Sequence, residues 1–360
     1  MKFIHTADLH LASAMESRLP PDKARVRRKE LFDTFRRLCD YAESEGVAAV
    51  MICGDIFDEG KPRDRYVRDF VAVVRDHPTV DFLCLAGNHD ESLSSVEGLP
   101  DNLLCFSDRA RKYSYGEVDI YGMELNGENY GLIYREIDPD PSRVNFVMLH
   151  GQAVAYGAAP APGTILLPLL CDKGVDYLAL GHIHSYREEA LDRRGVWCYS
   201  GCLEGRGYDE CGTKGFVLID TDGGTLKRTF IPFAERMIVE KNVLLTGAES
   251  EYDVEQRVSE AVSGVSPSDL VRVNLTGEVG VSLHFHTEDL EKALENRFFA
   301  ASVKNRTGPV VDVAAFAGEP SLRGEFVRTV TEDGALSEEE KTQILRCGIL
   351  ALTGEEVSFP

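Results

Sequence analysis

Five apolar runs of the sequence are each followed at once by a short motif that contains Asp, Asn or His. Each run has the length and composition of a strand that is buried on both faces of a parallel sheet. Sheets of that kind carry their functional groups just beyond the carboxyl ends of the strands. We therefore expect five polar motifs to meet at one edge of one sheet. The motifs are Asp8-Leu9-His10, Gly54-Asp55, Gly87-Asn88-His89-Asp90, His150-Gly151 and Gly181-His182-Ile183-His184.

The segments around these motifs alternate between strands and helices, which is typical of a layered α/β domain. Helices are predicted at about Asp22–Glu45, with Asp22 as the N-cap, and at Asp64–Asp76. A third helix is predicted at Thr164–Asp172, before the last motif. Residues 103–134 predict a meander in a second sheet. Antiparallel strands are predicted at 196–200, 215–220 and 225–232.

The pattern changes near Glu235, which predicts three domains or segments. Residues 1–235 form the α/β domain that carries all five motifs. Residues 236–318 predict a small α+β domain. Residues 319–360 predict a C-terminal helical segment that ends in an amphipathic helix, Ser337–Leu352. Such a helix packs more often on its own domain than on a partner.

The side chains of the five motifs offer carboxylate and amide oxygens together with imidazole nitrogens. This ligand set suits divalent metals such as manganese, iron or zinc, and it does not indicate a soft thiolate site. Asp8 and His10 stand at i and i+2, so an extended strand end turns both to one face. Asp55 is the candidate carboxylate to bridge two cations, which at roughly 3.5–4 Å apart clamp a phosphoryl group and activate water. The predicted metal ligands are Asp8, His10, Asp55, Asn88, His150, His182 and His184.

Three further residues are candidates for roles next to the metal ligands. His89 directly follows Asn88 and is placed to protonate the leaving group, with Asp90 orienting its ring. We therefore predict His89 and Asp90 as catalytic residues. Asp58 lies three residues after Asp55 and is a candidate acceptor that fixes a ligating histidine.

The net charge of −21 argues against a nucleic-acid partner, because phosphate backbones are bound by Lys and Arg. Two bound cations add about four positive charges where phosphate must sit. The basic residues are also clustered, since residues 23–29 carry five positive charges and no negative one. A basic helix face is often simply solvated, and contact with phosphate is the alternative. The candidate DNA contacts are Arg27, Arg28, Lys29 and Arg63.

Cysteine usage and hydropathy indicate a cytoplasmic protein. The nine cysteines are scattered, and several lie within predicted strands, which favours reduced, buried thiols over a disulfide framework. The sequence contains no apolar run of membrane-spanning length, and its first residues lack the anatomy of a signal peptide. A membrane partner is therefore not expected.

In their order, the five motifs resemble the signature of the calcineurin-like metallophosphoesterases. Within that superfamily, the segments Ile4–Leu11, Gly54–Asp58, Leu180–His184 and Tyr199–Leu218 are similar to the SbcD-type DNA repair exonucleases, especially their YhaO-like bacterial branch. The resemblance implies an α/β fold built as a four-layer double β-sandwich flanked by helices, with a small α+β cap domain and C-terminal helices. It also implies a site for two divalent cations, usually manganese, with iron, zinc or magnesium as alternatives.

The resemblance also implies roles for individual residues, carried over by position. One metal would take Asp8, His10, Asp55 and His184, and the other Asp55, Asn88, His150 and His182. His89 would be the catalytic acid. The module after Glu235 would be a DNA-contacting cap. The C-terminal helices would dock on a coiled-coil ABC-type ATPase of the SbcC kind, and a homodimer is a further candidate assembly.

Three functions are open at this point. The first is a metal-dependent DNA exonuclease or phosphodiesterase of a DNA repair complex, acting by a two-metal mechanism. The second is a small-molecule phosphodiesterase or phosphatase of the same superfamily, acting on cyclic nucleotides or nucleotide-linked lipids; the net charge favours it. The third is a regulatory subunit that binds metal only to organise an ATPase complex, which the complete ligand set disfavours.

Overall fold

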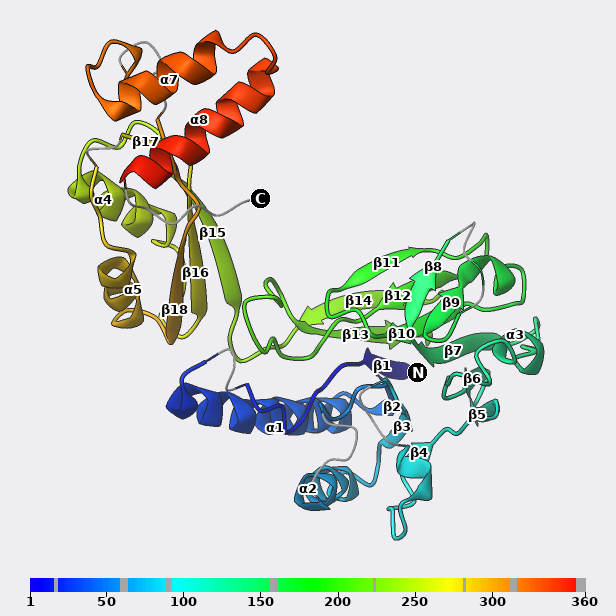
Figure 1. Cartoon of the computed structure of the whole chain (residues 1–360). Coiled ribbons are helices and arrows are strands. Elements are labelled where there is room, and N and C mark those ends of the chain that lie inside the picture. The colour runs from blue at the N-terminus through cyan, green and yellow to red at the C-terminus, as the bar shows by residue number, and fades with distance from the viewer. Residues whose placement is uncertain are drawn as a thin grey trace. The chain divides into compact units, whose positions relative to one another are not determined.

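The computed structural model of the chain describes residues 1–15, 19–58, 64–88, 92–155, 159, 161–222, 225–280, 283–310 and 316–353. The chain divides into two compact units, Met1–Ile238 and Val239–Pro360. The first unit contains two six-stranded sheets, and the second contains a smaller sheet with helices (Figure 1).

The first sheet has the strand order β14-β13-β1-β2-β3-β4. Its four parallel strands are β1 (Lys2–Thr6), β2 (Val47–Cys53), β3 (Asp81–Leu85) and β4 (Leu103–Cys105), and its antiparallel pair is β13 (Gly215–Asp220) and β14 (Lys227–Pro232). The crossovers between β1, β2 and β3 are α1 (Pro21–Ser44) and α2 (Asp64–Arg75). Both helices lie on the same side of this sheet (Figure 1), where Phe35 stacks on Phe70 with 5.1 Å between ring centroids.

The second sheet has the order β11-β12-β10-β7-β6-β5. Four central strands run parallel and the two edge strands run antiparallel to their neighbours. The strands are β5 (Arg111–Tyr115), β6 (Val118–Gly122), β7 (Val144–His150), β10 (Tyr177–Gly181), β11 (Arg187–Ala190) and β12 (Val196–Tyr199).

The main core lies between the two sheets. Phe3, Met51 and Leu83 of the first sheet pack with Phe146 and Ala179 of the second, and all are at most 1% exposed. Helices α1 and α2 cover the other face of the first sheet. The outer face of the second sheet is covered by α3 (Ile133–Glu136), a 3₁₀ turn (Leu167–Leu169) and the ribbon of β8 (Gln152–Val154) and β9 (Thr164–Leu166). A second 3₁₀ turn spans Leu93–Ser95. The predicted helix-flanked double β-sandwich is confirmed.

Three details of the sequence prediction are wrong. The predicted helix at Thr164–Asp172 is strand β9 followed by a single 3₁₀ turn, because Pro168 is excluded from a helix interior. The N-cap of α1 is Pro20 rather than Asp22, which lies in the first turn. Strand β12, predicted to join the antiparallel set with β13, pairs in parallel with β10 in the other sheet.

In its described residues, the second unit combines a three-stranded sheet with the helices α4, α5, α7 and α8. The sheet has the order β15-β16-β18, and its core holds Val258 of one helix and Leu290 of another against Val273. The last two helices pack on each other through Val327, Leu345 and Ile349. The elements are β15 (Ile238–Leu244), α4 (Glu251–Ala261), β16 (Leu270–Thr276), β17 (Glu278–Val279), α5 (Thr287–Glu295), β18 (Ala300–Asn305), β19 (Gly308–Pro309), α7 (Leu322–Glu332) and α8 (Glu338–Thr353). In the described part of the chain, we find no helix with both the length and the apolar character needed to cross a bilayer.

Arg27, predicted as a candidate DNA contact, is fully buried, so this prediction is wrong. Its guanidinium donates to Glu30 at 2.6 Å, to Glu204 at 2.9 Å and to the carbonyl oxygen of Gly205 at 2.6 Å. Glu204 also accepts from the backbone N–H of Glu235 at 2.8 Å. This cluster joins α1 to the loop before β13 and to the end of the first unit.

We expect Arg27→Ala to lower the free energy of unfolding by about 3–5 kcal/mol, because Glu204 is left as a buried charge without its partner. Lys29→Ala is the matched control: its side chain is 81% exposed, and we expect a change within about 0.5 kcal/mol. Urea denaturation of both variants measures the difference. Equal stability of the two variants would contradict the structural role of Arg27.

Candidate metal centre

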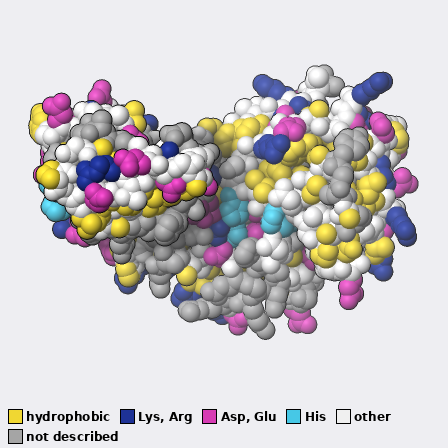
Figure 2. Space-filling view, turned by 45° about the horizontal axis from the view of Figure 1, so that its top comes forward, with side chains coloured by type: hydrophobic (Ala, Val, Ile, Leu, Met, Phe, Trp, Pro, Cys, Tyr) yellow, Lys and Arg dark blue, Asp and Glu magenta, His cyan; other side chains and the backbone are white. Residues whose placement is uncertain are grey.

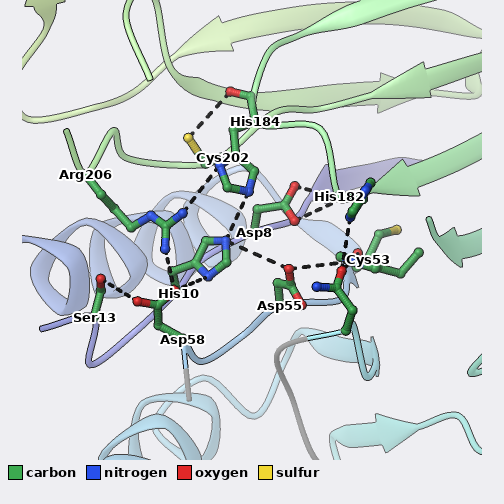
Figure 3. A network of polar contacts seen from close by, with 12 residues as sticks. Asp8, His10, Ser13, Cys53, Asp55, Asp58, His182, His184, Cys202 and Arg206 are labelled. Atoms are coloured by element: carbon green, nitrogen blue, oxygen red, sulfur yellow. Dashed lines mark hydrogen bonds and ion pairs between the residues drawn. The ribbon is translucent and has the colours of Figure 1, made fainter. Parts of the chain in front are cut away.

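The predicted metal ligands come from the carboxyl ends of strands in both sheets. Asp8 and His10 follow β1, Asp55 follows β2, and Asn88 follows β3 in the first sheet. His150 ends β7, and His182 and His184 follow β10, in the second sheet. The expectation that one sheet carries all five motifs is therefore wrong. The two sheets face each other, and their carboxyl ends bring the five labelled ligands Asp8, His10, Asp55, His182 and His184 together (Figure 3).

The backbone at the site is held in an uncommon conformation. Asp8, His10, Asp55 and His182 have φ values of 51°, 45°, 52° and 106°. Positive φ in a residue other than glycine costs of order 1–3 kcal/mol, and such strain gathers at functional sites. The flanking glycines allow close approach: a Cβ on Gly87 would lie 2.0 Å from Asp55 Oδ1. The strained backbone thus directs these side chains toward one point.

The first group of candidate ligands is Asp8, His10 and His184, whose ligand atoms lie within 4.8 Å of one another. His10 Nε2 and His184 Nε2 are 3.1 Å apart. The other ring nitrogens face carboxylates: His10 Nδ1 lies 3.1 Å from Asp58, and His184 Nδ1 lies 2.9 Å from Glu210. When both rings are neutral and their Nδ1 protons face these carboxylates, both Nε2 atoms present lone pairs to each other. Facing lone pairs of this kind fit a shared cation.

The second group is Asp8, Asp55 and His150, also with ligand atoms within 4.8 Å. His150 Nδ1 donates to the Cys53 carbonyl oxygen at 2.9 Å, so Nε2 carries a lone pair. That Nε2 lies 2.9 Å from Asn88 Oδ1 and 3.5 Å from Asp55 Oδ2. His182 Nδ1 lies 3.0 Å from the same Asn88 oxygen. The oxygens of Asp55 and Asn88 and the Nε2 atom of His150 are therefore acceptors that converge here, and they fit a divalent cation.

The two groups share one carboxylate, and a second carboxylate lies near both. Asp8 belongs to both, and each of its oxygens accepts from the His182 backbone N–H, at 3.0 and 3.1 Å. Asp55 Oδ2 lies 3.9 Å from His10 Nε2 and 3.5 Å from His150 Nε2. Asp55 belongs to the second group and also lies near His10 of the first, and its role as a bridging carboxylate stays a prediction.

Burial sets the protonation of the site. It lowers the pKa of His150 to about 4 and also lowers the pKa of His10, so both rings are neutral near pH 7 and able to bind metal. Burial opposes a charged His184, but the hydrogen bond to Glu210 and the negative charges of Asp8 and Glu210 together outweigh it and raise the pKa of that ring. Burial, with a smaller effect of the Asp55 carboxylate, raises the pKa of Asp8 to about 7, and a bound cation counteracts both effects.

The centre is open to the surface on one side. The His184 side chain is 25% exposed, and His182 is half-buried. Histidine side chains are visible at the surface of the first unit in Figure 2. A substrate phosphate can therefore reach the imidazole ligands from solvent.

Of the six remaining predicted residues, three lie in the part of the chain that the structure describes and three do not. Asp58 Oδ1 lies 3.1 Å from His10 Nδ1, and its role as an orienting acceptor stays a prediction. Arg28 is half-buried and donates to the Ala14 carbonyl oxygen at 2.6 Å, while Lys29 is exposed and lies 3.4 Å from Asp33. His89, Asp90 and Arg63 lie outside the described residues.

Sequence reasoning missed two charged residues at this centre, Arg206 and Glu210. They are 6% and 4% exposed and lie in the loop before β13. Glu210 contacts His184, and Arg206 contacts both Glu210 and Asp58. The sequence feature that could have pointed to them is their place in Tyr199–Leu218, a stretch that resembles the exonuclease family but contains no predicted ligand.

Comparison with known proteins gives consistent results. The family model described as calcineurin-like phosphoesterase matches residues 1–186. The chain is 26% identical over 243 residues to the DNA double-strand break repair protein Mre11 of Sulfolobus acidocaldarius, covering 62% of this chain and 61% of that protein. It is 28% identical over 249 residues to the uncharacterized metallophosphoesterase YhaO of Bacillus subtilis, covering 64% and 60%.

A third relative extends the match along the chain. The Mre11 protein of Methanopyrus kandleri is 26% identical over 318 residues, covering 76% of this chain and 67% of that protein. The aligned regions thus span about three fifths to two thirds of the length of these curated relatives.

We expect Gly87→Ala to lower the manganese content of the protein, because the new Cβ would meet Asp55 Oδ1 at 2.0 Å and displace the carboxylate. Gly127→Ala is the matched control, since its Cβ would have nothing within 4 Å. Elemental analysis of both variants after equilibration with manganese measures the effect. Gly87→Ala with the manganese content of the control would show that Asp55 is not a ligand.

Proposed function

The chain belongs to the calcineurin-like phosphoesterase family, and on this premise we propose that it is a metal-dependent phosphodiesterase that cleaves DNA. The observation that carries the proposal is the convergence of acceptor atoms from both sheets. His10 Nε2 faces His184 Nε2 at 3.1 Å, and His150 Nε2 faces Asn88 Oδ1 at 2.9 Å. Such an arrangement suits a pair of divalent cations, for which manganese is our first choice.

Seven side chains would hold the cations. Two divalent cations, when bound, stabilise charge on the phosphoryl oxygens and activate the attacking water. One cation would take Asp8, His10, Asp55 and His184, and the other Asp55, Asn88, His150 and His182. The carboxylates of Asp58 and Glu210 face Nδ1 of His10 and of His184. They would hold the ring proton on Nδ1, so that each ring offers Nε2 to the metal.

The proton for the leaving group would come from His89. Cleavage of a phosphodiester leaves a sugar oxygen that must be protonated as the bond to phosphorus breaks. His89 directly follows the ligand Asn88, and Asp90 would orient its ring. In this proposal His89 and Asp90 act on the substrate and bind no metal.

Three considerations support DNA as the substrate. Two of the relatives are named as DNA double-strand break repair proteins. The chain also carries the predicted α+β module, residues 236–318, which would contact DNA. Finally, basic side chains line a groove between α1 and α2, although acidic side chains line it too. The basic residues are Arg25, Arg28, Lys29, Arg36 and Arg65, and the acidic ones are Asp33, Asp69 and Asp76.

The wider setting is part of the same proposal. The C-terminal segment, residues 319–360, would dock on a coiled-coil ABC-type ATPase of the SbcC kind, and two copies of the chain would form a homodimer. The cysteine usage favours a cytoplasmic location.

A second candidate substrate class is a small phosphodiester, such as a cyclic nucleotide or a nucleotide-linked lipid. The net charge of −21 favours it, because a strongly acidic protein repels a DNA backbone. The metal centre serves either substrate, so the two candidates differ only in what reaches it.

The decisive assay is manganese-dependent digestion of end-labelled linear DNA and closed circular DNA, with cyclic nucleotides as parallel substrates. We expect shortening of linear DNA and little turnover of cyclic nucleotides. Turnover of cyclic nucleotides with intact DNA would favour the small-molecule candidate instead.

We expect His89→Ala to lower the rate of hydrolysis by roughly 10²–10⁴-fold, the usual contribution of a general acid, while manganese content stays at the wild-type level. Metal analysis and single-turnover digestion on the same preparation measure the two effects. His182→Ala is the control, because loss of a ligand should lower both manganese content and rate. Parallel loss of metal in His89→Ala would move His89 into the ligand set.

A further inference from the structure

The loop between β12 and β13 brings one buried arginine between the two carboxylates that face metal-site histidines. Arg206 is 6% exposed. Its Nη1 contacts Asp58 Oδ1, while its Nε and Nη2 donate to Glu210 Oε1 at 3.0 and 2.7 Å. Figure 3 shows Arg206 reaching toward Asp58 and His184. One guanidinium therefore contacts both acceptors at once.

Each of these carboxylates also contacts a ring of the first ligand group. Asp58 Oδ1 lies 3.1 Å from His10 Nδ1, and Asp58 Oδ2 accepts from Ser13 Oγ at 2.7 Å. Glu210 Oε1 lies 2.9 Å from His184 Nδ1, and Glu210 Oε2 accepts from the Arg206 backbone N–H at 2.7 Å. A chain of contacts thus runs from His10 through Asp58, Arg206 and Glu210 to His184.

We propose that Arg206 is a positioning residue for one of the two cation sites. By fixing the positions of the Asp58 and Glu210 carboxylates, it orients the rings of His10 and His184 so that their Nε2 atoms face each other. This inference rests on the metal centre of the proposed function. It concerns the site of His10 and His184 and leaves the site of Asn88, His150 and His182 unaffected.

The geometry requires an arginine. The guanidinium is a planar fork with N–H groups pointing in several fixed directions, so it reaches two carboxylates on different sides. A lysine ammonium is a compact point charge on a flexible stem and lacks this fixed spread of donors. The positive charge also offsets the repulsion between two partly buried carboxylates.

The loop has other anchors that do not involve Arg206. Lys214 Nζ donates to the His184 carbonyl oxygen at 2.6 Å, and Arg27 donates to the Gly205 carbonyl oxygen at 2.6 Å. The backbone N–H of Gly212 donates to Ile238 at 3.0 Å. These contacts hold the loop in place, so loss of the guanidinium should change the metal centre more than the fold.

The test is calorimetric titration of the full chain with Mn²⁺, which resolves the two cation sites without any substrate. For Arg206→Ala we expect the affinity of one site to fall by about 10–100-fold, the usual effect of losing a partner behind the ligands, and the other site to stay at the wild-type value. Arg194→Ala is the matched control, since it removes an arginine that pairs with Asp176 at 2.8–2.9 Å, and we expect no change at either site.

Two further variants separate positioning from stability. Arg206→Lys keeps the positive charge, and we expect the same one-site loss because lysine does not span both carboxylates. Glu210→Gln should weaken the same site, and its combination with Arg206→Ala should weaken it by less than the product of the two single effects. Thermal melting of each metal-free variant checks that it is folded.

The outcomes distinguish this inference from the proposed function. Wild-type affinity at both sites in folded Arg206→Lys and Arg206→Ala would overturn the inference and leave the function standing. Two Mn²⁺ sites without DNA cleavage would overturn the function, and the inference would still be decided by the affinities. A wild-type chain that binds no Mn²⁺ would overturn both.

Discussion

The rest of the site depends on hydrogen-bond acceptors that face one another and cannot form hydrogen bonds among themselves. His150 Nδ1 donates to the Cys53 carbonyl oxygen, which leaves Nε2 as a lone pair facing Asn88 Oδ1 and Asp55 Oδ2. Buried acceptors that face each other carry an electrostatic cost unless a positive charge lies among them. A folded chain keeps such a cluster when ligand binding repays that cost, and divalent cations are the ligands this donor set suits.

The double sandwich explains how the cluster is assembled. Each sheet carries part of the ligand set at the carboxyl ends of its strands, and the apolar core between the sheets fixes the distance across the gap. The ligand residues Asp8, His10, Asp55 and His182 have positive φ, so their side chains leave the strand direction and turn toward one another. Packing of the two sheets therefore stabilises a strained local backbone that an isolated loop would not keep.

Much of this arrangement could be predicted from sequence, because it is local. Each ligand follows an apolar run, and the end of a strand is visible in the chain as the place where the run stops. The division of the strands between two sheets was not visible, since strands buried on both faces read alike whichever neighbour they pair with. The burial of Arg27 was hidden for a similar reason: its partner Glu204 lies 177 residues away. Arg206 and Glu210 were missed because nothing in their own loop shows which histidine they face.

Anomalous diffraction from crystals of the full chain soaked in Mn²⁺ tests the central claim most directly. We expect two peaks about 3.5–4 Å apart, one beside His10 and His184 and the other beside Asn88 and His150, with Asp55 between them. A map without peaks at these side chains, or with its manganese bound elsewhere, would contradict the assignment of a two-metal centre to this chain.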